Sequence, residues 1–251
     1  MRKLHIALLL GLFAIAGVAK AQTNIQEMYD FNRNQMTTTL EMFKADNWGS
    51  TFFFVDIYHH FDKNTPTDFY TEIARSLNFW KGTALNDFNL HAEWNGGCGI
   101  FDLSELAYGG YAVNNAWLFG GEYFFHSQDF NNTLTLEVLY KNIRGIHSEV
   151  PMQFTAVWGM KDLFGAKGLN FSGFADFWWE DHSWGALNAD RETKCVFISE
   201  PQLWYNIGQF FNCENLYIGG EVEVSCNFSG KVDATKSGWE VNPAAGIKWN
   251  F

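Results

Sequence analysis

The last eight residues of the chain, "AAGIKWNF" (residues 244–251), alternate between apolar side chains and small or polar ones. The apolar residues share one parity, and they are Ala245, Ile247, Trp249 and Phe251. Chain ends usually fray unless other parts of the fold hold them. A strict period of two up to the terminal carboxylate therefore predicts a complete β-strand with one apolar face.

The opposite end predicts export. "MRKLHIALLLGLFAIAGVAKA" (residues 1–21) has a basic start, an apolar stretch and a closing Ala-Lys-Ala. This pattern is typical of a secretory signal peptide, cleaved before Gln22, and its apolar core is too short to span a bilayer comfortably. We therefore expect two segments, a signal peptide at 1–21 and a mature domain at 22–251.

The composition of the mature chain excludes several classes of protein. The signal segment holds three of the 17 basic residues and none of the 28 acidic ones, which leaves a formal charge of −14. So acidic a surface disfavours nucleic acid as a partner. The chain holds 25 Phe and 11 Trp, yet no apolar run after the signal is long enough for a spanning helix.

The apolar residues are instead spread with a period of two, as in "FNLHAEWN" (88–95). This alternation predicts twelve strands of about ten residues, a length that crosses a bilayer when the strand is tilted. We expect strands at 24–31, 35–44, 49–58, 67–79, 86–96, 110–125, 132–143, 150–160, 168–180, 194–206, 215–228 and 237–251.

The connections favour a transmembrane barrel over a soluble sandwich. Those after strands two, four, six, eight and ten are compact, while those after three, five, nine and eleven are longer and more polar. Short turns at one end and long loops at the other are typical of outer-membrane barrels. Aromatic residues near the strand ends fit two interfacial girdles; on the turn side they are Trp48, Trp80, Trp158, Trp204 and Trp249, and on the loop side Trp94, Trp179 and Trp239.

We thus expect an all-β, 12-stranded antiparallel barrel in the outer membrane of a Gram-negative bacterium, with short periplasmic turns and longer extracellular loops. Membrane lipid is one partner. The outer-membrane assembly machinery is another, because a terminal aromatic such as Phe251 after alternating apolar residues is the usual assembly signal of such barrels.

The usual catalytic motifs are absent from the sequence: it has no G-x-S-x-G, no phosphate-binding glycine loop and no H-E-x-x-H. We predict no catalytic residue, no cofactor and no metal site. His91 and Glu93 share a face and favour a hydrogen-bonded pair in the lumen, although acid–base chemistry is an alternative for them.

Alternation places many acidic side chains inside the barrel, because a charge facing lipid near the midplane costs several kcal/mol. The expected inward acids are Glu41, Asp56, Glu93, Glu122, Glu137, Asp176, Glu200, Glu221 and Glu223, with Lys141, Lys161 and Lys248 among them. Phe52, Phe54, Phe174 and Trp178 take the same parity and offer surfaces for stacking. Such a lumen suits small neutral or cationic solutes better than anions.

Four stretches carry a family resemblance: "TTLEMFKADNWGSTFFFVD" (38–56), "FYTEIARSLNFW" (69–80), "LNFSGFADFWWE" (169–180) and "GIKWNF" (246–251). They resemble the Tsx-like nucleoside-specific outer-membrane channels, and more closely a branch of that group found in Bacteroidetes. The resemblance implies a narrow barrel that carries nucleosides. The positions that match recurrent family residues are Glu41, Phe43, Trp48, Asp56, Glu72, Arg75 and Asp176.

Three hypotheses follow. The first is a diffusion channel for small polar solutes, with nucleosides suggested by the resemblance and with a lumen site of Glu41, Phe43, Phe54, Asp56, Glu72, Arg75, Asp176 and Trp178. The second is a closed barrel that acts through its loops as a binding or structural protein. The third is a barrel enzyme that uses His91 and neighbouring acids.

Two local features are open at this stage. Ile73 and Leu77 share the parity of Arg75, so an inward Arg75 requires a β-bulge or a different register. If a disulfide forms, we expect it between Cys195 and Cys226, which face each other in the predicted register.

Overall fold

The computed structural model describes residues 22–60, 67–104, 107–183, 192–228 and 238–251. The predicted signal peptide lies outside these residues. The described strands are β1 (Gln22–Asp30), β2 (Gln35–Asp46), β3 (Gly49–His60), β4 (Asp68–Leu77), β5 (Phe88–Ser104), β6 (Ala107–His126), β7 (Asn132–Ile143), β8 (Met152–Met160), β9 (Leu169–Ser183), β10 (Glu192–Ser199), β11 (Gln202–Asn206), β12 (Leu216–Cys226) and β13 (Trp239–Asn250). Two short 3-10 turns, η2 (Leu163–Gly165) and η3 (Gly208–Phe211), lie in connections.

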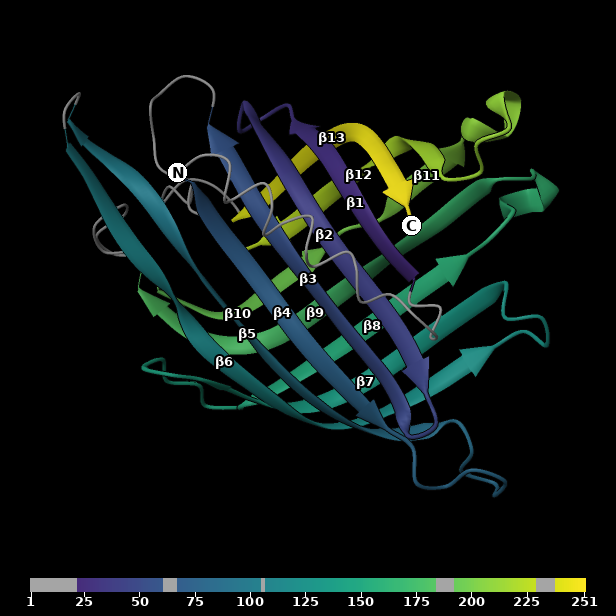
Figure 1. Cartoon of the computed structure of the whole chain (residues 1–251). Helices are drawn as coiled ribbons and strands as arrows, with labels where there is room; N and C mark the ends of the chain where they lie inside the picture. The colour runs from purple at the N-terminus through teal and green to yellow at the C-terminus, as the bar shows by residue number, and fades with distance from the viewer. Residues whose placement is uncertain (1–21, 61–66, 105–106, 184–191, 229–237) are drawn as a thin grey trace, which may run out of the picture.

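Each strand pairs antiparallel with its neighbours, and β1 pairs with β13 to close a barrel (Figure 1). Both β10 and β11 pair with β9 on one side and β12 on the other. They are therefore two halves of one wall strand, interrupted at Glu200 and Pro201, because proline has no N–H for the ladder. The wall has twelve strands, which confirms the predicted fold class.

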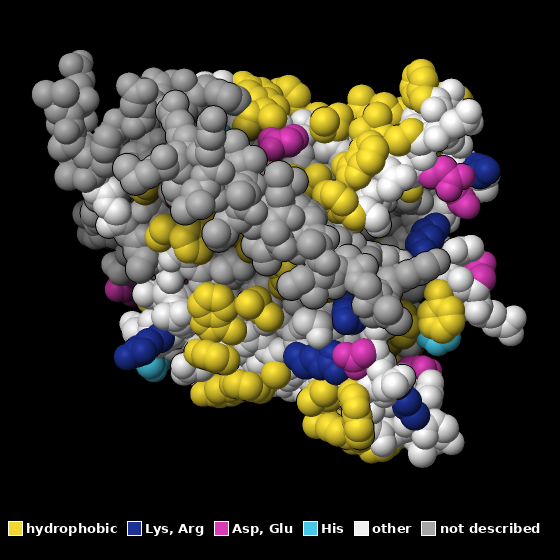
Figure 2. Space-filling view, viewed as in Figure 1, with side chains coloured by type: hydrophobic (Ala, Val, Ile, Leu, Met, Phe, Trp, Pro, Cys, Tyr) yellow, Lys and Arg dark blue, Asp and Glu magenta, His cyan; other side chains and the backbone are white. Residues whose placement is uncertain are grey.

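The outward face is apolar and exposed, as a bilayer requires. Large side chains on it that are about half exposed include Ile73, Trp117, Phe119, Val138, Ile218, Val241 and Ile247. Figure 2 shows several patches of hydrophobic side chains on this face of the molecule. At the strand ends Trp48, Trp239 and Trp249 are exposed, in agreement with the predicted girdles. Among the described residues, no helix is long and apolar enough to cross a membrane.

Three sequence expectations about placement are wrong. Trp204 is 1% exposed and points inward, while its neighbour Leu203 is 47% exposed. Adjacent apolar residues leave the parity of a strand undetermined, so alternation could not separate these two. Lys161 is exposed in the turn between β8 and β9 instead of facing the lumen. Cys226 lies opposite Phe197, two residues from the predicted partner Cys195.

The long loop expected after strand five is instead a continuation of the sheet. β5 runs to Ser104 and β6 starts at Ala107, with paired residues along most of the extension. Its glycines read as loop residues in the sequence, but they allow close pairing. A Cβ on Gly97 would lie 2.3 Å from the carbonyl oxygen of Phe69 on β4, so the neighbouring strand leaves no room for a side chain there.

Candidate functional site

The first part of the site is a row of inward side chains across three neighbouring strands. Glu41 on β2 lies opposite Phe54 on β3, which in turn lies opposite Glu72 on β4. The Glu41 carboxylate accepts a hydrogen bond from Asn24 Nδ2 at 2.8 Å, and Glu72 accepts one from the Tyr70 hydroxyl at 2.6 Å. The structure thus brings three of the predicted lumen residues together.

Asp56 and Phe43 lie on either side of this row. The Thr39 hydroxyl donates to Asp56 Oδ1 at 2.5 Å, so that this carboxylate is tied to the neighbouring strand. Phe43 takes the inward parity of β2 opposite Phe52 and is 41% exposed near the end of the strand. Both residues face the lumen as predicted, Asp56 toward its middle and Phe43 at its turn-side mouth.

Asp176 and Trp178 face the lumen from β9. The Thr155 hydroxyl donates to Asp176 Oδ1 at 2.5 Å. Lys141 Nζ lies 3.6 Å from the ring centroid of Trp178, a cation–π contact, so a lysine already covers one face of the predicted stacking surface. Alternation in the sequence placed Asp176, Trp178 and Lys141 on the inward face, but it could not show that Lys141 and Trp178 are in contact.

Acids from different walls approach one another across the lumen. Glu72 on β4 is in electrostatic range of Asp176 on β9 and Lys141 on β7. Asp56 on β3 is likewise in range of Glu200, at the break between β10 and β11. Acidic side chains from opposite walls thus interact across the middle of the lumen.

The prediction that Arg75 lines the lumen is wrong. β4 pairs with β3 and β5 in regular register without the required bulge, so Arg75 shares the outward face with Ile73, which is 51% exposed. Its guanidinium binds Asp46 through both terminal nitrogens, at 2.7 and 2.9 Å, and Thr51 at 2.8 Å. An outward arginine is tolerated here because it lies near the strand end, where the cost of charge is small, and is paired.

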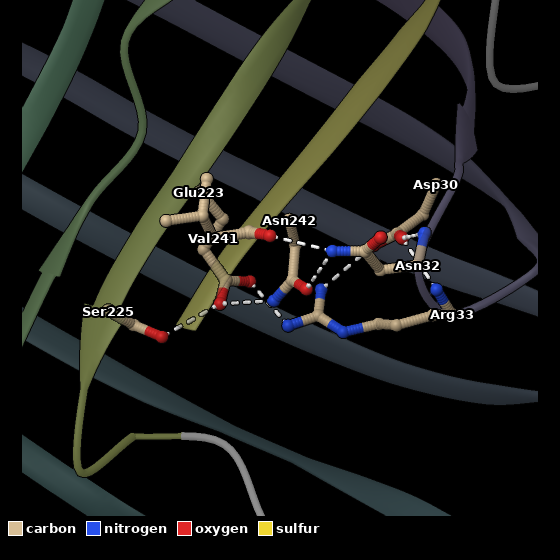
Figure 3. A network of polar contacts seen from close by, with 7 residues as sticks. All are labelled: Asp30, Asn32, Arg33, Glu223, Ser225, Val241 and Asn242. Atoms are coloured by element: carbon tan, nitrogen blue, oxygen red, sulfur yellow. Dashed lines mark hydrogen bonds and ion pairs between the residues drawn. The ribbon is translucent and has the colours of Figure 1, made fainter. Parts of the chain in front are cut away.

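Arg33 lies at the opposite mouth. It lies in the turn between β1 and β2 and reaches across β1 and β13 to Glu223 on β12, at 2.6 Å from Nη2 to Oε2 (Figure 3). Nη1 lies 3.1 Å from Asp30 Oδ2. Ser225 and Asn242 donate to the other oxygen of Glu223 at 3.0 and 3.1 Å. Sequence alternation placed Glu223 inside but gave no sign of its partner, because 190 residues separate the two.

A cluster around His91 lies near the turn-side end of the lumen. His91 Nδ1 is 2.7 Å from Glu122 Oε2 and 3.6 Å from Glu137 Oε2, and His91 Nε2 is 3.1 Å from Glu93 Oε2. Asn89 Nδ2 donates to Glu122 Oε1 at 2.9 Å. The predicted pairing of His91 with Glu93 is thus present, within a larger group from β5, β6 and β7 that alternation alone does not bring together.

The comparisons with known proteins support the fold. The NanC porin structure is 7% identical, with a TM-score of 0.53 over 91% of this chain and 100% of that chain. Pseudomonas aeruginosa OccK2 (OpdF) is 13% identical over 90% of this chain and 60% of that chain, but its TM-score of 0.34 is too low to add support. At such identities the likeness concerns the fold alone. A comparison with curated proteins gives no match.

The sequence family is more definite. A family described as "Domain of unknown function (DUF5020)" matches residues 22–251, which is all of the predicted mature chain. The match is to this family rather than to the Tsx-like channels that the motifs resemble. The chain folds as a closed antiparallel β-barrel, and it belongs to the DUF5020 family.

Proposed function

We propose that the protein is an outer-membrane channel for small polar solutes that are neutral or cationic. The observation that carries this proposal is that the wall of the closed barrel is apolar on its outer face and acidic on its inner face. Its outer face exposes apolar and aromatic side chains, and its inner face carries Glu41, Asp56, Glu72 and Asp176. An acidic lumen enclosed by such a wall attracts cations and repels anions.

Nucleosides are the solutes that we favour within this class, as the motif resemblance suggests. A carboxylate such as Glu41 or Asp56 can accept hydrogen bonds from sugar hydroxyls. Phe54 lies between two such carboxylates and offers a ring for a base, a kind of contact worth about 1–3 kcal/mol per base in nucleic-acid complexes. Trp178 contributes less than predicted, because Lys141 covers one of its faces.

The test is single-channel recording with the purified, folded barrel in a planar bilayer, while adenosine or thymidine is titrated in. We expect concentration-dependent block of the ion current that is weaker in Glu41→Gln and Asp56→Asn. Arg75→Gln is the control, since Arg75 points away from the lumen. Open channels whose current no nucleoside blocks would rule out nucleosides as the solute and would indicate a general small pore.

A second candidate is a closed barrel that acts through its loops. One observation favours it: many inward side chains are less than 9% exposed, among them Gln26, Leu118, Leu139 and Trp204. Several of the polar ones bond to each other, as Gln26 does to Asn24. Folded barrels that conduct no current at all would favour this candidate over the channel.

A further inference from the structure

We propose that the lumen holds a binding site for one divalent transition-metal ion of the zinc class, with His91, Glu122 and Glu137 as ligands. All three residues are 7% exposed and come from β5, β6 and β7. Their ligand atoms lie within 4.8 Å of one another. An imidazole and two carboxylates form a donor set that suits Zn²⁺ and its neighbours better than Mg²⁺ or Ca²⁺, which take oxygen ligands.

The two nitrogens of His91 face different carboxylates, an arrangement that can be divided into the two roles such a site needs. Nε2 lies 3.1 Å from Glu93 Oε2, and Nδ1 faces Glu122 and Glu137. A histidine that binds a metal usually donates its other N–H to a carboxylate, which fixes the ring and its tautomer. In the unliganded structure Nδ1 hydrogen-bonds Glu122 Oε2 at 2.7 Å. When a metal ion replaces that proton, the hydrogen on Nε2 stays directed to Glu93 and the lone pair of Nδ1 faces the ion.

The carboxylates themselves are oriented. Asn89 Nδ2 donates to Glu122 Oε1 at 2.9 Å and leaves Oε2 directed at His91. Asn95 Nδ2 donates to Glu93 Oε1 at 3.3 Å in the same way. The amides thus hold the outer oxygens, and the inner oxygens converge on the imidazole.

Glu137 is the second, independent sign of a ligand. Its side chain is more than nine-tenths buried, and among the described residues no group donates a hydrogen bond to it. Its charged contact is His91 Nδ1, at 3.6 Å. A largely buried carboxylate with one distant cationic contact is poorly compensated, and a bound cation would improve that compensation.

Charge and distance both fit a dication. Three carboxylates surround one imidazole, so with all three ionised even a protonated His91 leaves the cluster with a net charge of −2. Ligand atoms around a tetrahedral zinc ion are about 3.3 Å apart. The His91–Glu137 separation of 3.6 Å is close to this value, and the His91–Glu122 hydrogen bond of 2.7 Å must widen when a metal replaces its proton.

The test uses the full folded barrel in detergent, titrated with ZnCl₂ in a calorimeter and with CoCl₂ by visible absorption. We expect one saturable equivalent, with affinity at least tenfold lower in His91→Ala and in Glu137→Gln. Asn89→Ala, which frees Glu122, should lower affinity about 10–100-fold, as removal of ligand-orienting groups usually does. His147→Ala is the control, because that histidine is exposed and pairs with Asp181 outside the cluster.

Heat-modifiable gel mobility identifies variants that remain folded. If His91→Ala does not fold, Glu137→Gln and Asn89→Ala decide the question. No saturable binding, or binding that these variants leave unchanged, would overturn the proposal. The outcome is separate from that of the channel proposal, since a barrel that binds Zn²⁺ without conducting ions would retain the site and lose the channel.

Discussion

Removal of the Arg33 guanidinium should destabilise the barrel through two carboxylates that lose their cation. In Arg33→Met the apolar part of the side chain remains, but Asp30 and Glu223 keep their charges at 8% and 7% side-chain exposure. Backbone N–H groups still bond Asp30, and Ser225 and Asn242 still bond Glu223. The two carboxylates therefore lose their ion pairs with Arg33 but keep their other hydrogen bonds.

The magnitude follows from geometry and exposure. A hydrogen bond to a charged group contributes about 1.5–3 kcal/mol net. The Arg33 side chain is 34% exposed, which reduces this contribution through solvent screening. We expect a coupling free energy between Arg33 and Glu223 of about 1–2 kcal/mol.

The assay is a double-mutant cycle with Arg33→Met, Glu223→Gln and the double variant, each refolded into detergent micelles. Tryptophan fluorescence during urea unfolding gives the free energy of unfolding for each protein, under conditions where unfolding is reversible. A coupling within about 0.3–0.5 kcal/mol of zero, the range of additivity for independent sites, would refute the argument that this pair stabilises the mouth of the barrel.

Three further predictions concern closure, assembly and pH. Gly246→Val should abolish the heat-modifiable folded band, because its Cβ would lie 1.9 Å from a carbonyl oxygen of β1. Gly110→Ala is the control, because the nearest atom to its Cβ would lie 3.7 Å away, at an ordinary contact distance. A folded Gly246→Val would contradict the closure of β1 against β13. Deletion of Phe251 should reduce insertion into outer membranes, as measured by fractionation, and normal insertion would show that the terminal aromatic is dispensable. A hydrogen bond from the Ser127 hydroxyl lowers the pKa of the Asp129 carboxyl in the turn between β6 and β7. This group stabilises the fold above its unfolded pKa of about 3.9 and ceases to do so as the pH falls through the lower folded pKa. The difference in urea stability between wild type and Asp129→Ala should therefore be constant above about pH 5 and shrink in acid; a difference that grows in acid would contradict it.

The sequence predicted the architecture well, because a barrel wall is set by a local rule. Period-two alternation and turn residues placed all twelve wall strands, with bounds within about three residues of those observed except at the end of β5, which runs eight residues further, to Ser104. The rule fails where neighbouring residues are alike, as at Leu203 and Trp204, and where glycines form paired strand instead of loop, as at Gly97. In both cases the side chains do not show which face of the strand they occupy, either because two neighbours are both apolar or because glycine has no side chain.

The site was less predictable, because its contacts join strands that are far apart in the chain. Alternation placed Glu93, Glu122 and Glu137 inside, but only the register of β5 with β6 and β6 with β7 brings them to His91. Had the pairing register of these strands been predicted together with their inward faces, the cluster could have been predicted from the sequence. Arg33 had no such signal, since it lies in a turn outside the alternating pattern.

The measurement that tests the central claim most directly is the reversal potential of single channels formed by the purified barrel in a KCl gradient. An open, acidic lumen predicts a current carried mainly by K⁺, with a cation preference that falls in Glu41→Gln and Asp56→Asn and is unchanged in Arg75→Gln. A folded barrel that passes no current, or one that prefers chloride, would contradict the account.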